Sequence, residues 1–278
     1  MDHYSPDLFD VAGIFYNIGI VYTKQAKYDQ ALDCYELALK INSTYLEGIN
    51  LSVAALYNNR AIVYKNQRKY DDSINDLNAA LDIYKACQVN TNDFRLLCIQ
   101  NNIASVYKSQ TFYDDALDCL NGLLGIEKNN QRGEHIRLSG FYGNLGSIYK
   151  CKEDYENALS CYRHSIEIVK KHRGDDRHPD IAIDYRNMGY VYFCLKQFDL
   201  ALEFVNKSID ILKETLGSDH NEVANALLMI GEVYLQDNQL QQAKDSFLNS
   251  AKIYATIFGD DYFQSVHALL KVNEINNI

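Results

Sequence analysis

The sequence lacks tryptophan and contains 2 prolines in 278 residues. Proline ends helices and marks loops, so its scarcity favours long helices joined by short turns. No apolar run approaches the roughly 18 residues needed to cross a membrane. The N-terminal segment also lacks the basic and apolar regions of a secretory signal. These absences predict a helical protein without membrane insertion.

Positive charge is scarce too, because 27 Lys and Arg residues stand against 37 Asp and Glu residues, for a formal net charge of −10. Nucleic acids and anionic membrane surfaces are bound by basic faces, so neither is expected as a partner. The 7 cysteines are odd in number and include no CxxC pair. This pattern is typical of free thiols in a reducing compartment, and we therefore expect a cytoplasmic protein.

Internal repetition is abundant. Six similar segments follow one another at intervals of 42 or 43 residues and begin at Tyr16, Asn58, Asn101, Gly143, Arg186 and Leu228. In each segment a small residue is followed three positions later by tyrosine, as in Gly19 and Tyr22, which places both on one face of a helix. The small residue allows a second helix to approach closely. The pattern predicts a first helix, A, packed against a second helix, B, in every repeat.

A large residue six positions after each tyrosine marks the turn from helix A to helix B. These residues are Tyr28, Tyr70, Tyr113, Tyr155, Phe198 and Leu240. An acidic residue usually follows, in the first turn of helix B, where the helix dipole favours negative charge. A second small residue, such as Ala31 or Ala201, stands three positions after the large one.

This order of small residue, tyrosine, large residue and small residue resembles the tetratricopeptide repeat. With its longer period and segments such as GDDRHPDIAIDYRNMGYVY, the chain is most similar to the kinesin light chain subgroup. The resemblance covers residues 15–251 and implies an all-α fold: an α-solenoid wound as a right-handed superhelix of six helix-turn-helix repeats plus a C-terminal capping helix. We expect one domain over residues 1–278, with repeats at 12–45, 54–87, 97–130, 139–172, 182–215 and 224–257 and a terminal helix at 262–276.

The sequence departs from the family pattern in two ways. The tryptophan usual near the start of helix A is absent from every repeat, and the heptad region of a true kinesin light chain is missing. A motor subunit is therefore not expected.

The two ends carry weaker signals. Ser5 and Pro6 fit a helix start, with serine as the cap and proline at the first helical position. Near the other end, Tyr262 is 42 residues after His220, which is itself 42 residues after His178. The last segment therefore looks like helix A of a seventh repeat. Either it caps the stack, or the chain is part of a longer array.

A row of asparagines stands two residues before the small residue of helix A. The row consists of Asn17, Asn59, Asn102, Asn144 and Asn187, and Met229 interrupts it in the sixth repeat. Asparagine has no propensity advantage inside a helix, so its recurrence needs a cause. An amide can donate and accept at once, which suits the main chain of an extended peptide. We predict peptide binding by this row; the alternative is that the amides bond to neighbouring repeats.

Basic residues recur on the same side of helix A, at Lys24, Lys65, Lys108, Lys150 and Arg186, against the single acid Glu232. This pattern predicts a preference for acidic peptides, with Tyr190 as a further contact. The alternative is that the lysines neutralise the ends of the A helices, where the dipole favours cations. Apolar residues of the later repeats form either an anchor site or tighter packing: Ile183, Tyr190, Phe193, Leu228 and Leu235.

Motifs of catalysis are missing. The 7 histidines show neither HxxxH nor HExxH spacing, and no P-loop, GxGxxG or GxSxG pattern occurs. Cys34, Cys119 and Cys161 share one position in helix B, which we interpret as a packing position. His178 and His220 share a position at a helix start, which indicates a role in the turn. We predict no enzymatic activity, no metal, no cofactor and no small-molecule substrate.

Two functions remain open on the sequence. One is an adaptor that binds a protein or peptide ligand in the concave groove lined by the A helices. The other is a structural scaffold or self-assembling module that uses its convex surface or its ends, including a fragment of a larger signalling protein or bacterial effector.

Overall fold

The computed structural model describes residues 6–45, 50–90, 93–128, 136 and 138–277. Within these residues the chain forms 13 helices and no strand, so the prediction of an all-α repeat fold is confirmed. Backbone packing divides the chain into two compact units, residues 1–131 and 132–278. That all six repeats form one continuous solenoid over residues 1–278 stays a prediction.

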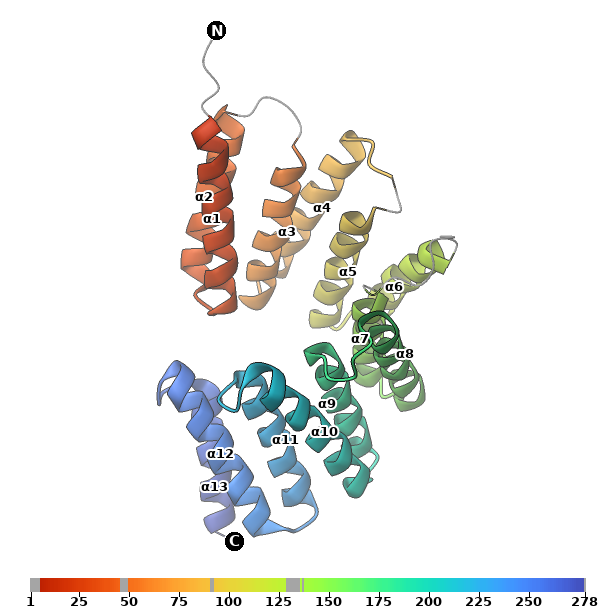
Figure 1. Cartoon of the computed structure of the whole chain (residues 1–278), viewed down its shortest axis with the longest axis vertical. Coiled ribbons are helices and arrows are strands. Elements are labelled where there is room, and N and C mark those ends of the chain that lie inside the picture. The colour runs from red at the N-terminus through yellow and green to blue at the C-terminus, as the bar shows by residue number, and fades with distance from the viewer. Residues whose placement is uncertain (1–5, 46–49, 91–92, 129–135, 137, 278) are drawn as a thin grey trace. The chain divides into compact units, whose positions relative to one another are not determined.

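The first unit consists of three helical hairpins (Figure 1). Its helices are α1 (Pro6–Lys24), α2 (Tyr28–Tyr45), α3 (Leu51–Asn66), α4 (Tyr70–Ala86), α5 (Phe94–Ser109) and α6 (Tyr113–Lys128). Odd-numbered helices are the A helices. Each packs along its own B helix and against the B helix of the preceding hairpin, and neighbouring A helices also touch. The A helices of the unit thus share one face.

The second unit contains three more hairpins and a terminal helix, packed in the same order. Its helices are α7 (Leu138–Cys151), α8 (Tyr155–Arg173), α9 (Pro179–Cys194), α10 (Phe198–Leu216), α11 (Asn221–Gln236), α12 (Leu240–Phe258) and α13 (Phe263–Asn276). The capping role predicted for Ser5 lies outside the described residues, whereas α1 does begin at Pro6.

The small residues of helix A let the two helices of a hairpin approach closely, as the sequence predicts. A Cβ atom placed on Gly189 would lie 2.5 Å from Cγ2 of Val205 and 3.1 Å from the carbonyl oxygen of Ala201. At Gly231 it would lie 2.6 Å from the buried ring of Phe247. Such separations are too short for real contacts, so a larger residue at either position would force Val205 or Phe247 to shift.

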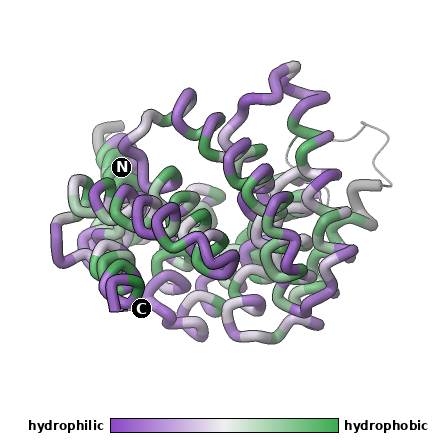
Figure 2. The backbone as a smooth tube through the Cα atoms, turned by 90° about the horizontal axis from the view of Figure 1, so that it is seen from below, coloured by the Kyte–Doolittle hydropathy of each residue, from purple (hydrophilic) through white to green (hydrophobic). Residues whose placement is uncertain are grey.

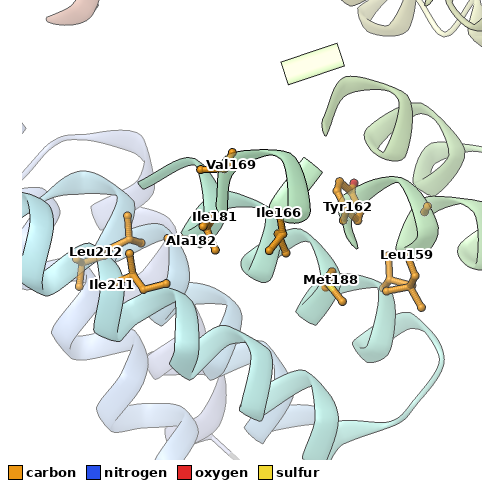
Figure 3. Close-up of a cluster of buried hydrophobic side chains, with 12 residues drawn as sticks. Leu159, Tyr162, Ile166, Val169, Ile181, Ala182, Met188, Ile211 and Leu212 are labelled. Atoms are coloured by element: carbon orange, nitrogen blue, oxygen red, sulfur yellow. The ribbon is translucent and has the colours of Figure 1, made fainter. Parts of the chain in front are cut away.

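Successive hairpins are joined by apolar cores between helix B and the next helix A. In the second unit Tyr162 and Ile166 of α8 belong to the same buried cluster as Ile181 and Met188 of α9 (Figure 3). Hydrophobic and hydrophilic residues are interspersed along the helices (Figure 2), as is typical of helices that bury one side and expose the other. Stability therefore comes mainly from contacts between sequence neighbours.

Helix A ends in the same backbone turn in every repeat. The carbonyl oxygen of the repeated tyrosine accepts a hydrogen bond from the amide five residues later, as from Lys69 to Tyr64 at 2.9 Å. Just before that amide stands a residue with positive φ, the arrangement of a Schellman motif. These residues are Ala26, Arg68, Thr111, Glu153, Lys196 and Asn238. None is glycine, although glycine is the residue that this conformation favours.

Two repeats carry charged residues at positions where the other repeats have uncharged ones. In the second repeat Arg60 of α3 donates to Asp76 of α4 at 2.7 Å, and both side chains are largely buried. The equivalent pair in the fourth repeat is Leu145 and Cys161. In the fifth repeat the buried Asp184 faces Gly143, since a Cβ atom on that glycine would lie 3.4 Å from Oδ1 of Asp184.

Histidines begin two of the A helices. The Nδ1 atom of His178 accepts from the backbone amide of Asp180, and that of His220 accepts from the amide of Glu222, both at 3.2 Å. The predicted turn role of these histidines is therefore confirmed as helix capping. Tyr262 occupies the same position before α13 without a side-chain cap.

Candidate functional site

A pocket of 570 Å³ lies on the A-helix face of the second unit. Its walls come from α7, α9, α11 and α13, which are the A helices of the last three repeats and the terminal helix. The lining residues are Lys150, Arg186, Asn187, Tyr190, Phe193, Asn225, Leu228, Met229, Glu232 and His267. Four residues of the predicted peptide site, Lys150, Arg186, Asn187 and Tyr190, are thus brought together.

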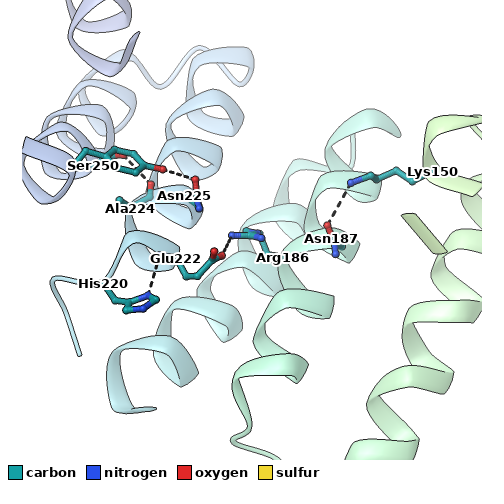
Figure 4. Close-up of polar contacts among 9 residues, drawn as sticks. Lys150, Arg186, Asn187, His220, Glu222, Ala224, Asn225 and Ser250 are labelled. Carbon is teal, nitrogen blue, oxygen red and sulfur yellow. Dashed lines mark hydrogen bonds and ion pairs between the residues drawn. The ribbon is translucent and has the colours of Figure 1, made fainter. Parts of the chain in front are cut away.

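Lys150 links α7 to α9 at the edge of the pocket. Its Nζ atom lies 3.4 Å from Oδ1 of Asn187, a bond drawn in Figure 4, and 4.8 Å from the centre of the Tyr190 ring. The negative face of an aromatic ring attracts a cation, and the amide oxygen accepts from the ammonium. Both contacts hold a positive charge beside an exposed aromatic surface.

Arg186 carries less net charge into the pocket than its sequence position suggests. Its guanidinium forms an ion pair with Glu222 of α11 (Figure 4), and both side chains are largely buried. Among the other lining residues, Oε1 of Glu232 lies 3.9 Å from Nζ of Lys271 of α13. Lys150 is the other lysine or arginine of the pocket lining.

The apolar wall of the pocket is aromatic and aliphatic. The ring centres of Tyr190 and Phe193 are 6.2 Å apart with tilted planes, and Leu228 and Met229 of α11 complete the wall. Two other residues of the predicted apolar patch lie elsewhere: Ile183 is exposed outside the pocket lining, and Leu235 packs against the core around Phe247.

In the first unit, the asparagine row forms bonds between neighbouring A helices. Nδ2 of Asn59 donates to the hydroxyl of Tyr16 at 2.9 Å and to the carbonyl of Ala55 at 3.1 Å. Nδ2 of Asn102 donates to Oδ1 of Asn58 at 2.8 Å. The alternative weighed on the sequence, bonding between repeats, is thus present for these residues.

The remaining members of the row differ in exposure. Asn17 of α1 is exposed. Asn144 and Asn187 are half-buried on α7 and α9, and Asn187 accepts from Lys150. In Asn59 and Asn102 these bonds use the amide nitrogen, Nδ2, and not Oδ1. In Asn187 the bond uses the amide oxygen, Oδ1, and not Nδ2.

The lysines of the first unit lie near the ends of their A helices. Lys24 is exposed at the end of α1, and Lys108 is half-buried on α5. Nζ of Lys65 donates to Oγ of Ser105 at 3.0 Å. Burial lowers the pKa of Lys65, and the charge of Lys108 lowers it further. Like charges are therefore concentrated on this face of α3 and α5.

The repeat architecture has a counterpart among known families. The model of the tetratricopeptide repeat matches residues 10–86, 95–171, 137–214 and 180–256. The chain belongs to the tetratricopeptide repeat family. Repeats of this family are protein-interaction repeats that are generally not enzymes, and the chain is accordingly a protein–protein interaction module.

Solved structures with the same tetratricopeptide fold include three that differ in origin. A putative kinesin light chain from Podosopora anserina has a TM-score of 0.58 and 18% identity, over 74% of this chain and 96% of that one. A Rap protein complexed with competence and sporulation factor has a TM-score of 0.67 and 19% identity, over 95% and 74%. BtubC from P. vanneervenii has a TM-score of 0.62 and 16% identity, over 92% and 94%. No curated protein matches the sequence.

The pocket of the second unit contains residues that were not predicted from the sequence. Asn225 and His267 are 42 residues apart and share a repeat position, so the period itself could have identified them. Met229 was noted as the break in the asparagine row, and it replaces an amide with an apolar group at the pocket wall. The hydroxyl of Tyr254 donates to Oδ1 of Asn225, which fixes the orientation of that amide.

The cysteines of the repeats are free thiols, and those of helix B pack against neighbouring helices. Cys34 and Cys161 are buried and Cys119 is half-buried, in agreement with their shared packing position. Burial raises the pKa of all three thiols, that of Cys161 to about 11, so their reactive thiolate form is disfavoured. Across the described residues, no cluster of three or more His, Cys, Asp or Glu side chains is arranged to hold a metal. None of the described helices is long and apolar enough to span a membrane.

Proposed function

We propose that this chain binds an extended peptide segment along its A-helix face. In the proposal, the pocket of the second unit receives an apolar side chain of the ligand, and Lys150 binds an acidic residue beside it. The observation that carries the proposal is the composition of this pocket, in which a lysine, two amides and an aromatic wall converge from four A helices.

The apolar part of the proposal follows from exposed surface. Tyr190 is 44% exposed although it lies in a concave site with Phe193, Leu228 and Met229. Binding energy at protein interfaces is concentrated where an aromatic or aliphatic anchor fills such a pocket. An inserted leucine or aromatic side chain would remove this surface from water.

The acidic part of the proposal depends on Lys150. A carboxylate bound to an ammonium group forms a charge-assisted hydrogen bond, which is stronger than a neutral one. Arg186 is already compensated by Glu222, so we assign it a supporting role, holding α9 against α11. Lys24, Lys65 and Lys108 are proposed to attract acidic segments to the face of the first unit.

The amide row is proposed to hold the peptide main chain. The bonds between repeats orient the side-chain amides of the row and leave Oδ1 of Asn59 and Asn102 and Nδ2 of Asn187 for a ligand. Each such bond would contribute about 0.5–1.5 kcal/mol. Asn17 and Asn144 are proposed as further members of the same row. That the Rap protein named above was solved with competence and sporulation factor also supports ligand binding by this fold.

Fluorescence polarisation with a labelled peptide library tests this function. The library carries one leucine or aromatic residue followed by glutamate, with a second library carrying glutamine in place of glutamate. Lys150→Gln should weaken binding of the glutamate peptides about tenfold and reduce the salt dependence of their affinity. The glutamine peptides should be affected less.

Lys207→Gln is the matched control. Nζ of Lys207 also lies over an aromatic ring, 5.0 Å from the centre of Phe204, but on the B helix α10. Its replacement should leave the affinity unchanged. If the two variants weaken binding equally, or if the affinity of the wild type does not respond to salt, the proposed role of Lys150 is wrong.

A further inference from the structure

The first helix of the chain exposes an apolar face that every later A helix buries. Ile14 is 56% exposed and Val21 is 51% exposed, whereas the residues at their equivalent positions are at most 8% exposed. The equivalents of Ile14 are Leu56, Ile99, Phe141, Asp184, Ala226 and Ala268, and those of Val21 are Val63, Val106, Ile148, Val191, Val233 and Ile275. Ile18, which lies between the two, is 38% exposed.

The later repeats show what covers this face. Leu56 and Val63 of α3 pack in one cluster with Tyr35 of the preceding B helix, α2. At the other end of the chain, Ala268 of α13 packs in the same way with Phe247 of α12. The face of an A helix that contains these positions is thus built to receive another helix, and on α1 no described part of the chain covers it.

The asparagine row points to the same face. Asn59 and Asn102 each donate to a residue of the preceding A helix, at 2.9 and 2.8 Å. Asn17 is their equivalent on α1 and is exposed beside Ile14, Ile18 and Val21. We call these four residues the α1 stripe. Their spacing of three and four residues places them on one side of the helix.

Charges at the two ends of the α1 stripe are opposite. Asp10 lies one turn before Ile14 and Lys24 lies one turn after Val21, and both are exposed. The stripe is therefore self-complementary when two copies of α1 run antiparallel. Ile14 of one copy then meets Val21 of the other, and Asp10 comes close to Lys24 at each end. Parallel copies would instead bring like charges together.

The middle of the α1 stripe suits a two-fold axis. In the antiparallel arrangement Asn17 and Ile18 of the two copies lie nearest to each other, and two asparagine amides can donate and accept reciprocally. Gly13 has open space around the position of a Cβ atom, which allows a close approach of the partner's Val21. A contact in which both copies use the same patch is the usual form of a closed dimer.

We propose that two copies of this chain associate through the α1 stripe, with their α1 helices antiparallel. This interface belongs to the first unit and does not depend on the pocket proposed above, but Asn17 and Lys24 would contact the second copy in the dimer, so there they would not be available to a peptide. A face one helix wide lies at the small end of specific interfaces, below about 1,200 Å² in total. The dimer is therefore expected to dissociate on dilution through the micromolar range.

Sedimentation equilibrium of the full chain over a series of concentrations measures this association. The mass should rise from the 31.9 kDa of one chain towards twice that value. Val21→Glu should hold the mass at that of one chain while circular dichroism shows unchanged helicity. Leu37→Glu, at an aliphatic residue of α2 that is 46% exposed, is the control and should associate like the wild type.

Charge reversal tests the antiparallel arrangement. Asp10→Lys and Lys24→Asp should each raise the dissociation constant about tenfold, and the double variant should restore it. An equal mixture of the two single variants should also associate. A wild type that stays at the mass of one chain, a dimer unaffected by Val21→Glu, or a double variant as weak as the single ones would overturn the proposal.

Discussion

The carboxyl group of Asp184 is buried in the second unit. It occupies the position of Leu56 and Ile99, and no basic side chain is paired with it among the described residues. Burial raises the pKa of Asp184 to about 7, the charge of Asp180 adds to the rise, and the nearby Ser165 hydroxyl opposes it. The folded second unit therefore favours the protonated acid.

This raised pKa predicts a dependence of stability on pH. In the unfolded chain an aspartate titrates near pKa 3.9. The stabilising contribution of the protonated form is thus complete below about pH 4 and is lost as the pH rises through about 7. Asp184→Asn should stabilise the chain at pH 8 by roughly 1–3 kcal/mol and change little at pH 4.5. Thermal unfolding of both proteins at both pH values measures the difference, and an equal effect at both would contradict it.

At the same scale, the sequence predicted the structural role of a residue better than the residue that it contacts. The repeat period identified the packing positions of Cys34 and Cys161 and the turn position of His220, because these depend on neighbours along the chain. It did not reveal that Glu222 compensates Arg186, since that pair depends on how two helices are rotated about their axes. The charge on a binding face cannot be obtained by counting charged residues alone.

At the scale of the element, the hairpin is held together by the close approach of its two helices. Gly189→Ala should destabilise the chain by about 1–3 kcal/mol, because the added methyl group overlaps Val205 and the Ala201 carbonyl. Gly122 lies inside α6 with open space around it, so Gly122→Ala should instead stabilise by about 0.5–1 kcal/mol. Chemical unfolding of both variants distinguishes these effects. A loss of stability in both would mean that the helical glycines have another role.

The turn between the helices stores strain that the sequence does not show. Thr111 has φ of 66°, a left-handed conformation that is unfavourable for a β-branched residue. Thr111→Gly should stabilise the first unit by roughly 0.5–1.5 kcal/mol, and Asn238→Gly, at the equivalent turn of the sixth repeat, by less. Melting temperatures of the two variants provide the comparison. If Asn238→Gly gained more than Thr111→Gly, strain at this position would not be the cause.

The backbone conformation of this turn was harder to predict than the two helices that it joins. The small residue, tyrosine and large residue predicted every hairpin because they form its internal packing. The residue in the left-handed conformation varies between alanine, arginine, threonine, glutamate, lysine and asparagine, so no glycine marks the end of helix A. The turn is set by the fixed hairpin geometry, which overrides local preference.

At the scale of the whole molecule, the period of 42 or 43 residues predicted the tetratricopeptide fold, because each repeat contacts mainly its neighbours. The candidate site was predicted in part. Lys150 and Asn187 were identified from columns of recurring residues and Tyr190 from a patch of apolar residues, whereas the lining also includes His267 of α13, which was not predicted, and Met229, which interrupts the asparagine row.

Hydrogen exchange measured by mass spectrometry would show whether a peptide binds on the A helices, as we propose. The chain is compared with and without the tightest glutamate peptide from the library described above. Slower exchange is predicted in α7, α9, α11 and α13, with α8, α10 and α12 unchanged. Protection confined to the B helices would contradict the account.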